Sequence, residues 1–244
     1  IEVTAQKTLE WDRDAKTFTA RQDAIAKQGT SELHGDTLVA KYNEGADGKG
    51  MTINRIDATG HVKVISEGSV ATGDQGFFNM KDNYAELTGN NLKMVTKTDT
   101  VTARDKLTYH MSKREMNAYG NAVATRGDDV IHGDRLIGRM KPGVSGKDEM
   151  DEMEAIGNVV VTTPTDILYG DRAIYQAASN KTIVTGNVRI ERGPNIITGS
   201  RGEMDMNTNV SKIFGGTPNP ASVDSTGTAA PGADGRVRGV FYPE

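Results

Sequence analysis

The histidines and the acidic residues are the side chains of this sequence that could perform chemistry. Two of the four histidines, His34 and His132, stand directly before a Gly-Asp step, and imidazole is a common zinc ligand. Histidines at equivalent positions of a repeated structure lie several repeats apart, so they cannot close around one ion. We therefore predict that the chain holds no metal.

Carboxylates also occur in groups that could serve as general acid and base, such as Asp128 with Asp129, and Glu149 with Asp151 and Glu152. These groups stand in polar, loop-like segments, where carboxylates are usually solvated. The aspartates that recur after glycine suggest calcium, but the nonapeptide pattern of calcium-binding β-rolls is missing. Because aspartate often hydrogen-bonds the backbone of turns, we interpret the recurring aspartates as turn residues.

Motifs of enzymes are absent from the sequence. It has no G-x-S-x-G, no H-E-x-x-H and no P-loop. It also has no cysteine, which excludes a disulfide framework and thiol catalysis. The formal net charge of −4 provides no basic field for nucleic acid. We therefore predict a non-enzymatic protein without cofactor or nucleic-acid partner.

The composition is typical of a protein with a modest core and many turns. Of the 244 residues 36% are hydrophobic, and 28 are glycine. No apolar run approaches the roughly 18 residues that span a bilayer as a helix. The sequence opens on Ile1 rather than on methionine, and we expect that a signal peptide has been removed.

An internal repeat organises the sequence. A Gly-Asp step recurs, and a second step, usually Gly-Asn, lies 13 residues before it at three places, 60→73, 120→133 and 157→170. Two repeats carry extra polar residues at 43–50 and 141–151, which we expect to be loops at one end of a hairpin. Alignment gives seven repeats, which start at Lys7, Asp36, Asp74, Asp105, Asp134, Asp171 and Ser200.

Hydrophobic and polar residues alternate within each repeat. A period of two indicates strands with one buried face and one wet face, and the frequent glycines disfavour helices. We predict an all-β fold with strands of about six residues, turns at the Gly-Asp and Gly-Asn steps, and no helix longer than two turns. Because all repeats bury the same face, their stacking makes an internal apolar strip.

The spacing of the G-N-x-V and G-D steps, together with the opening VTAQKTLEWD, resembles the LptA/OstA-like family of lipopolysaccharide-transport proteins. The resemblance covers about residues 1–216. It implies an elongated, V-shaped antiparallel β-jelly roll in the periplasm of a Gram-negative cell, with an apolar groove for the acyl chains of lipid A. It also implies end-to-end association with itself and with LptC-like and LptD-like jelly rolls. The chain is longer than a compact member of that family.

The groove implied by the resemblance would be lined by inward positions of the strands. The strip mixes glycine and alanine with methionine and phenylalanine, a composition that adapts to variable ligands. Basic side chains at its rim would meet the anionic head group, namely Arg135, Arg139 and Arg172. The expected lipid-binding residues are Phe78, Tyr109, Met111, Leu136, Val159, Val161, Tyr175 and Val188.

Three other interpretations remain open. The inward side chains could form an ordinary packed core with no ligand. A parallel β-helix enzyme acting on polysaccharide would also be rich in glycine and asparagine, although it would need carboxylates or basic residues clustered on one exposed sheet. A filament-forming scaffold of stacked strands would differ by showing no affinity for lipid.

The last part of the sequence departs from the repeat. Residues 217–235 consist almost entirely of Thr, Pro, Ser, Gly and Ala, the composition of a flexible linker. Residues 236–244 then regain a strand-like pattern. They are either a frayed tail or a tethered strand that covers an open sheet edge of this chain or of a partner.

Overall fold

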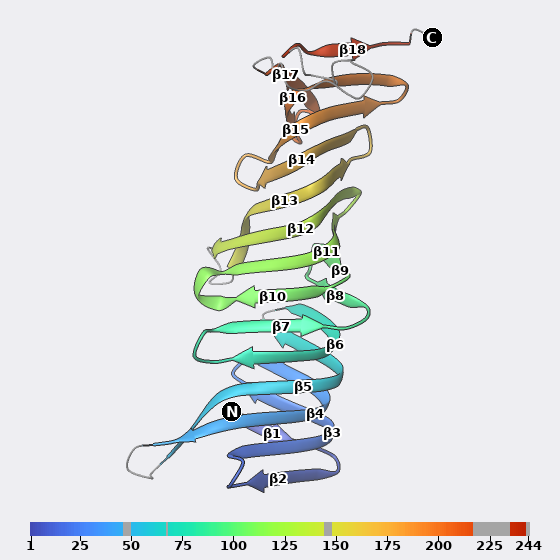
Figure 1. Ribbon diagram of the computed structural model, residues 1–244. Coiled ribbons are helices and arrows are strands. Elements are labelled where there is room, and N and C mark those ends of the chain that lie inside the picture. Colours follow the sequence, from blue (N-terminus) through green and yellow to red (C-terminus); the bar gives the residue numbers. More distant parts are fainter. Residues whose placement is uncertain (46–49, 67, 144–147, 217–234, 243–244) are drawn as a thin grey trace, which may run out of the picture. The chain divides into compact units, whose positions relative to one another are not determined.

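The structure is a computed structural model that describes residues 1–45, 50–66, 68–143, 148–216 and 235–242. Antiparallel strands make up most of these residues, and the one described helical turn is η1 (Met111–Lys113). The chain divides into two compact units, residues 1–120 and 121–244. Within each unit the strands follow one another along the sheet largely in chain order (Figure 1).

Unit 1 is built around four long strands, each paired with its neighbour. Two short strands take the place of one long strand at three levels of the sheet. β1 and β2 pair with the two halves of β3, and β7 and β8 pair with the two halves of β6. At the next level β10 pairs with β7, and β9 pairs with β8. The strands are β1 (Glu2–Thr4), β2 (Thr8–Asp12), β3 (Thr17–Gln28), β4 (Ser31–Glu44), β5 (Met51–Ser66), β6 (Ser69–Asn79), β7 (Tyr84–Thr88), β8 (Leu92–Val95), β9 (Asp99–Ala103) and β10 (Lys106–His110).

Unit 2 repeats this arrangement after β11, which begins in unit 1. Its long strands pair in sequence from β12 to β16. The last level again consists of two short strands, because β17 pairs with one half of β16 and β18 with the other. The strands are β11 (Glu115–Arg126), β12 (Asp129–Pro142), β13 (Asp148–Thr162), β14 (Ile167–Gln176), β15 (Lys181–Arg192), β16 (Asn195–Asp205), β17 (Val210–Phe214) and β18 (Arg238–Val240).

The Gly-Asp and Gly-Asn steps are bends inside long strands, not turns between short ones. At each step the pairing register skips two residues, as between Ile156 and Val159 where β13 pairs with β14, and between Tyr169 and Arg172 where β14 pairs with β15. The predicted strand length of about six residues is therefore wrong, since the long strands continue through the bend and contain up to 16 residues. The sequence pattern located the interruption correctly, but a bulge and a turn both use glycine.

The recurring aspartates connect neighbouring strands at these bends. The Asp134 carboxylate accepts a hydrogen bond from Asn158 Nδ2 at 2.9 Å, and Asp171 accepts one from Asn187 Nδ2 at 2.9 Å. Each partner lies on the following strand, so the aspartates do not simply cap their own turns as predicted. We call four such contacts the bend pairs: Asp36–His61, Asp74–Asn90, Asp134–Asn158 and Asp171–Asn187.

Glycine is required at the second step of each bend pair. Gly157 has a φ of +75°, and a Cβ there would lie 2.3 Å from Asp134 Oδ2. The aspartate carboxylate thus occupies the space that any side chain at this position would fill. The glycine supplies both the left-handed backbone and the room for the bend pair.

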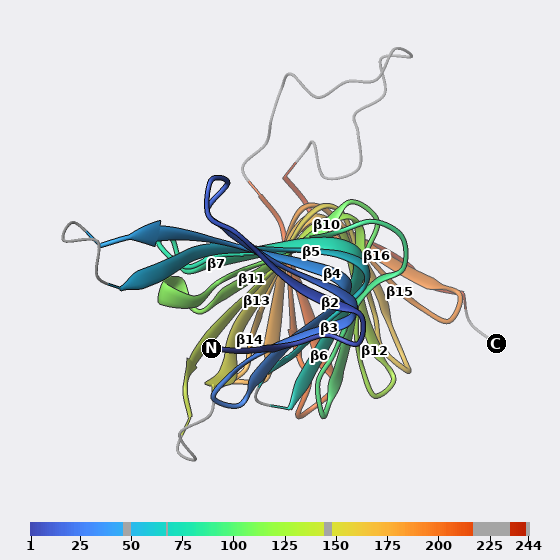
Figure 2. The same cartoon turned by 90° about the horizontal axis from the view of Figure 1, so that it is seen from below.

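The bends turn the two halves of a strand into two facing half-sheets with apolar inner faces. For example, a Cβ at Gly202 on β16 would lie 3.1 Å from Val188 Cγ1 on β15. Gly202 pairs with Val184, which precedes the bend of β15, whereas Val188 follows that bend. In Figure 2 the hairpin of β4 and β5 projects beyond its neighbours. The described ends of the segments 43–50 and 141–151 continue the strand pairing, as in Asn43 opposite Thr52 and Lys141 opposite Glu149. Residues 46–49 and 144–147, on which the predicted loops fall, lie outside the described residues.

The antiparallel pairing also tests one of the alternatives. Every strand pairing given for the described residues is antiparallel, as between β14 and β15. A parallel β-helix is therefore excluded as the architecture of these strands. None of the helical segments in the described part of the chain is long and apolar enough to cross a membrane.

Candidate functional site

The inner face of each unit carries an apolar strip that changes in side-chain size along the strands. Next to the bends the strip contains completely buried alanines, including Ala118 in unit 1 and Ala155 and Ala173 in unit 2, beside larger residues such as Leu136 and Val184. Toward the strand ends the buried residues are larger, for example Tyr42 and Met153. Side chains of mixed size therefore fill the interior next to the bends, and larger ones fill it further out.

Four of the predicted lining residues belong to the most deeply buried part of unit 2. Leu136 and Val159 are each 1% exposed, Val188 is 2% exposed and Val161 is 3% exposed. Their burial shows that period-two counting identified the inner face correctly. In this conformation they contact protein atoms on all sides.

Three aromatic lining residues lie on the same inner face but are only half-buried. Phe78 stands opposite Ile56, and Tyr109 stands opposite Met116. Both partners are buried, and cross-strand partners share a face of the sheet. Tyr175 stands in the same way opposite the buried Met153. We call Phe78 and Tyr109 in unit 1, and Tyr175 in unit 2, the aromatic edge of their respective units.

Met111 does not lie where the alternation placed it. The strand β10 ends at His110, and Met111 begins the turn η1, which closes at Arg114 in the left-handed region. Its side chain is 44% exposed. The expected inward strand position was wrong because the counting was continued beyond the end of the strand.

The three arginines expected at the rim lie on the outer face of the sheet. Arg135 follows the exposed Asp134 and precedes the inward Leu136. Arg139 Nη2 and Arg172 Nε both donate to the Glu154 carboxylate, at 3.0 and 2.7 Å. A head group would meet these arginines outside the half-sheet and in competition with Glu154.

Glu154 is nearly buried within this network. Its side chain is 8% exposed although it stands on the outer face. Burial alone would raise the pKa of Glu154, but the hydrogen bonds from Arg172 and Arg139 outweigh that effect and hold the pKa below its ordinary value. The network therefore ties β12, β13 and β14 together through one ionised carboxylate.

The other candidates for chemistry have structural partners. His34 Nε2 lies 2.8 Å from Glu32 Oε2, and His132 Nε2 lies 2.7 Å from Asn121 Oδ1. The acidic group predicted to be a loop lies on β13, where Asp151 forms an ion pair of 2.8 Å with Lys141. In the part of the chain that the structure describes, no three His, Cys, Asp or Glu residues are arranged to hold a metal ion.

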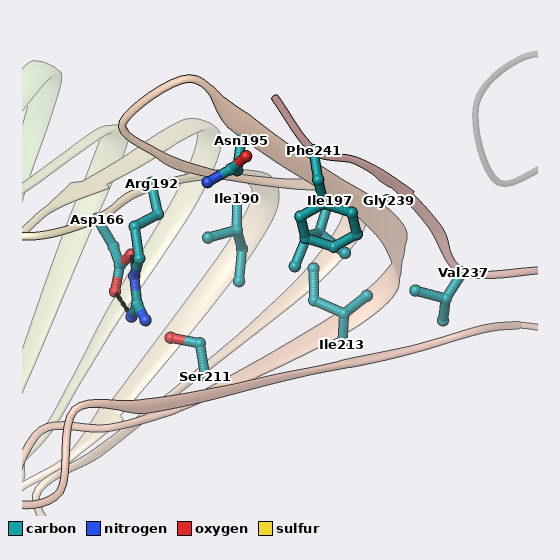
Figure 3. A pocket seen from close by; sticks show the side chains of 10 residues that line it. All are labelled: Asp166, Ile190, Arg192, Asn195, Ile197, Ser211, Ile213, Val237, Gly239 and Phe241. Carbon is teal, nitrogen blue, oxygen red and sulfur yellow. Dashed lines mark hydrogen bonds and ion pairs between the residues drawn. The ribbon is translucent and has the colours of Figure 1, made fainter. Parts of the chain in front are cut away.

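Unit 2 contains a cavity of about 510 Å³ at its last level (Figure 3). The Ile190–Ile197 cross-strand pair of β15 and β16 lies on one side of it, and Ile213 of β17 on another. Val237 and Phe241, which flank β18 on its two sides, line it as well. The cavity exists where the last level consists of two separate short strands in place of one bent strand.

The polar end of the cavity is formed by an ion pair. Arg192 donates from Nε and Nη2 to the two carboxylate oxygens of Asp166, each at 2.6 Å. Asp166 stands in the turn before β14, where its backbone N–H donates to Thr163 Oγ1, and its side chain is 1% exposed. The paired geometry raises the pKa of Arg192 through the hydrogen bonds with Asp166.

Ser211 also lines the cavity, and its hydroxyl is on the same side as the ion pair in Figure 3. The Ser211 Oγ atom is buried and has no hydrogen-bond partner in the structure. A buried hydroxyl without a partner is unfavourable. The cavity therefore offers an apolar wall together with an unused hydrogen-bonding group at one end.

Neither this cavity nor the Asp166–Arg192 pair was predicted from the sequence. A signal for Asp166 was present, because the pattern Thr-x-Thr-Asp occurs twice, as Thr96 to Asp99 and as Thr163 to Asp166, and forms the same turn both times. The tail was noticed for its strand-like residues. Its β18 pairs with Ile196–Thr198 of this chain, whereas residues 217–234 lie outside the described residues.

Comparison with known proteins gives one family. Residues 2–115 and 100–210 each match the model of the family described as LptA/(LptD N-terminal domain) LPS transport protein. No curated protein matches the chain. Among solved structures it is similar to LptH, the LptA homologous periplasmic component of the lipopolysaccharide transport device from Pseudomonas aeruginosa, with 16% identity and a TM-score of 0.46 over 59% of this chain and 95% of that chain.

Proposed function

Because the chain belongs to the family of LptA and LptD N-terminal lipopolysaccharide-transport domains, we propose that it carries lipopolysaccharide through the periplasm towards the outer membrane. The acyl chains lie against the inner strips and move along them without covalent chemistry. The observation that supports this proposal most directly is the aromatic edge. Phe78, Tyr109 and Tyr175 are aromatic inward side chains that are only half-buried, and the Tyr175 hydroxyl donates to Asn180 Oδ1 at 3.0 Å.

The strength of binding must allow transfer. Burying an acyl chain contributes about 0.8 kcal/mol per methylene, so complete burial of a dozen carbons would contribute on the order of 10 kcal/mol. A chain held that strongly would leave slowly. A chain that lies along a half-buried edge loses only part of its contact with water, so it can be held and still released to the next position.

Photo-crosslinking tests this proposal. A photoreactive amino acid at position 109 or 175 would stand at the aromatic edge, and one at 189 would serve as the outward control, because Arg189 is exposed. We expect lipopolysaccharide adducts at 109 and 175 and few at 189. Positions 136 and 161 would test the deeper strip, and adducts there would show that the half-sheets separate around the lipid.

Two outcomes of this experiment contradict the proposal. Equal labelling at all positions would indicate non-specific contact with lipid. No labelling at 109 and 175, with the protein folded, would identify the inner strip as an ordinary core and favour a structural scaffold.

The partners are proposed from the edges of the sheet. All five residues of β2 are exposed, and an unpaired strand edge is a template for another strand. We therefore expect end-to-end association of this chain with itself and with LptC-like and LptD-like domains. Light scattering over a concentration series should show growing assemblies, and mixing with such domains should show complexes. A monomer at millimolar concentration that binds neither domain would contradict this expectation.

A further inference from the structure

We propose that the tail strand β18 forms, together with β17, a docking surface for a second copy of this chain, and that this surface is incomplete without the tail. The two strands receive the first level of that copy, β1 and β2, as the next level of the sheet. The inference deepens the proposed function, on which it rests for end-to-end association as such. It adds the requirement for the tail and the register of the contact, and both are argued from pairings inside unit 1.

A junction inside unit 1 has the same strand arrangement as the proposed contact. There β7 and β8 pair with the two halves of β6, and β10 and β9 follow them as the next level (Figure 1). In unit 2, β17 and β18 pair with the two halves of β16 in the same order. The last level of unit 2 is therefore built like a level that does carry another one in this protein.

The first level of unit 1 resembles the strands that complete this junction. Residues 3–11, which include parts of β1 and β2, and residues 101–109, which include parts of β9 and β10, share the pattern V-T-A-x-x-x-L-x-aromatic. The same backbone hydrogen bond of 2.8 Å links both segments to the following strand, from Gln6 N to Gln22 O and from Arg104 N to Gly120 O. The first level of a second copy can therefore take the place that β9 and β10 take inside unit 1.

The apolar side chains of the internal junction are buried, whereas their counterparts at the two terminal levels are more exposed. The residues at the junction are at most 7% exposed, namely Leu87, Leu92, Val101 and Leu107. Their counterparts, found from the pairing positions and the shared pattern, are Ile213, Val237, Val3 and Leu9. Leu9 is 61% exposed and Val237 is 46% exposed. Contact in the internal arrangement would bury these side chains, and the hydrophobic effect therefore favours it.

The internal pairing also gives the register of the contact. Leu107 on β10 stands opposite Leu87 on β7. Leu9 of the second copy is the counterpart of Leu107, and Ile213 is the counterpart of Leu87. We therefore expect Leu9 of the second copy to stand opposite Ile213 on β17, with the two strands antiparallel.

Charge favours a second copy as the partner. The described residues 210–216 and 235–242 include three basic side chains and no acidic one. Residues 1–12 carry three acidic side chains and one lysine. In the register given above, Glu10 of the second copy stands opposite Lys212. Opposite charges at such positions stabilise a cross-strand pair.

The tail strand supplies half of this surface and is held by few contacts. It pairs with β16 over three residues, and Tyr242 N donates to Asn195 Oδ1 at 3.0 Å. A Cβ at Gly215 would collide with Gly235 O, so the chain reaches β18 beside the point where it leaves β17. Without the tail the last level offers β17 alone, and Val237 is missing from the contact. The tail therefore decides whether this end accepts one strand of a second copy or two.

Self-association of the full chain, measured by analytical ultracentrifugation over a concentration series, tests the requirement for the tail. Removal of residues 236–244 should raise the dissociation constant about tenfold, because it deletes one half of the surface. Asn195→Ala, which loosens the tail without removing it, should raise the dissociation constant about threefold.

A charge exchange tests the register. Lys212→Glu and Glu10→Lys should each weaken self-association about threefold to tenfold, because like charges then stand opposite each other. The chain that carries both substitutions should regain the original affinity. Leu9→Asn should weaken self-association about tenfold. Lys93→Glu, the same change at an exposed position of β8, is the matched control and should leave the dissociation constant unchanged.

The outcomes separate this inference from the proposed function. If the chain associates but neither charge substitution changes the affinity, the docking surface is wrong and end-to-end association uses another contact. Tighter association after removal of the tail would show that β18 blocks this end, and it would overturn the inference. A monomer at every concentration would overturn it as well. In each of these cases lipopolysaccharide adducts at positions 109 and 175 report on the carrier function independently.

Discussion

The first level of unit 1 (β1 and β2) and the last level of unit 2 (β17 and β18) have the same strand arrangement but differ in their interior. Each consists of two short strands that pair with the two halves of one long strand. At the first level an aromatic cluster lies on the inner face: the rings of Trp11 and Phe18 lie 5.5 Å apart, and those of Phe18 and Tyr42 lie 5.1 Å apart, while Trp11 itself is 47% exposed. At the last level a cavity remains.

The difference follows from how the two short strands are connected. β1 and β2 are separated by three residues, Ala5–Lys7, and the backbone of Gln6 still hydrogen-bonds Gln22 on β3. β17 and β18 are separated by residues 215–237. A continuous chain fixes both halves with respect to each other, so large side chains can be fitted between them. A short strand such as β18, which returns from a distant part of the sequence, covers the edge of the sheet but leaves the cavity beneath it.

The largest expected effect tests the aromatic cluster. Tyr42 is 2% exposed and accepts a hydrogen bond of 2.9 Å from Trp11 Nε1. Tyr42→Ala should lower the free energy of unfolding of unit 1 by about 3 kcal/mol, because it leaves a cavity between the half-sheets. Urea unfolding followed by fluorescence of Trp11, the single tryptophan, measures it.

The matched variant at the other end is Tyr242→Ala, at a tyrosine that is 58% exposed. We expect it to change stability by less than about 0.5 kcal/mol. Equal effects of the two substitutions would show that the aromatic cluster does not distinguish the first level of unit 1 from the last level of unit 2.

The bends nearest the two ends should respond to substitution in opposite directions. Gly186 on β15 has a φ of +76°, and a Cβ there would lie 2.3 Å from Asp171 Oδ2, so Gly186→Ala should destabilise unit 2 by about 2 kcal/mol. Gln22 on β3 has a φ of +68° without being glycine, so Gln22→Gly should stabilise unit 1 by about 1 kcal/mol. Amide hydrogen exchange in β15 and β3 measures both changes. A stabilising Gly186→Ala would show that the bend pair does not need its present geometry.

Acid should weaken unit 2 through Glu154. The folded-state pKa of Glu154 is depressed below its ordinary value of 4.5. Its contribution to stability is therefore fully present above pH 4.5 and is lost as the pH falls through the folded-state pKa. We expect about 1–2 kcal/mol, reduced by the partial exposure of both arginines.

Hydrogen exchange in β13 as a function of pH measures this loss, and Glu154→Gln is the control that should remove most of it. Asp57 provides the comparison in unit 1. Burial would raise the pKa of Asp57, but hydrogen bonds from Arg55 and Lys41 lower it below its ordinary value of 3.8. Its stabilisation should be fully present above pH 3.8 and be lost as the pH falls through the folded-state pKa of Asp57. Acid sensitivity of β13 that survives in Glu154→Gln would contradict this assignment.

The smallest effect concerns the bend pairs. In unit 1 one of them contains His61, whose pKa is raised above 6.5 by its hydrogen bond with Asp36 and by the charge of that carboxylate. The stabilisation is present below pH 6.5 and is lost as the pH rises through the folded-state pKa. The bend pairs of unit 2 use Asn158 and Asn187, which do not titrate in this way. NMR titration of the His61 ring should give a pKa above 6.5, and Asp36→Asn should lower it. An unchanged value in that variant would contradict the pairing.

The sequence predicted those features that depend on local periodicity. The alternation identified the buried faces, and Leu136 and Val188 are buried as expected. It could not show that β10 ends at His110, because a turn residue such as Met111 continues the same spacing for one more step. The glycine steps were located correctly but assigned to turns, since the residue types of a bulge and of a turn are the same.

Features that depend on distant residues were not accessible to the same reasoning. Glu154 meets Arg139 and Arg172 only because β12, β13 and β14 pair in a particular register. An alternating pattern does not specify which outward residues of neighbouring strands stand together. The cavity depends on a three-residue strand that pairs far back along the chain, and so short a segment carries no periodicity.

The bend pairs also determine how many residues can be added to or removed from such a chain at once. An aspartate on one strand needs its Gly-Asn or Gly-His partner on the following strand, as Asp134 needs Asn158 and Asp171 needs Asn187. Inserting or deleting a single strand would leave a carboxylate beside another carboxylate, and would reverse the direction of every later strand. A duplication that includes two strands preserves both. Proteins built in this way should therefore differ in length by strand pairs, about 30 residues at a time, as Asp105 and Asp134 are here separated by 29 positions.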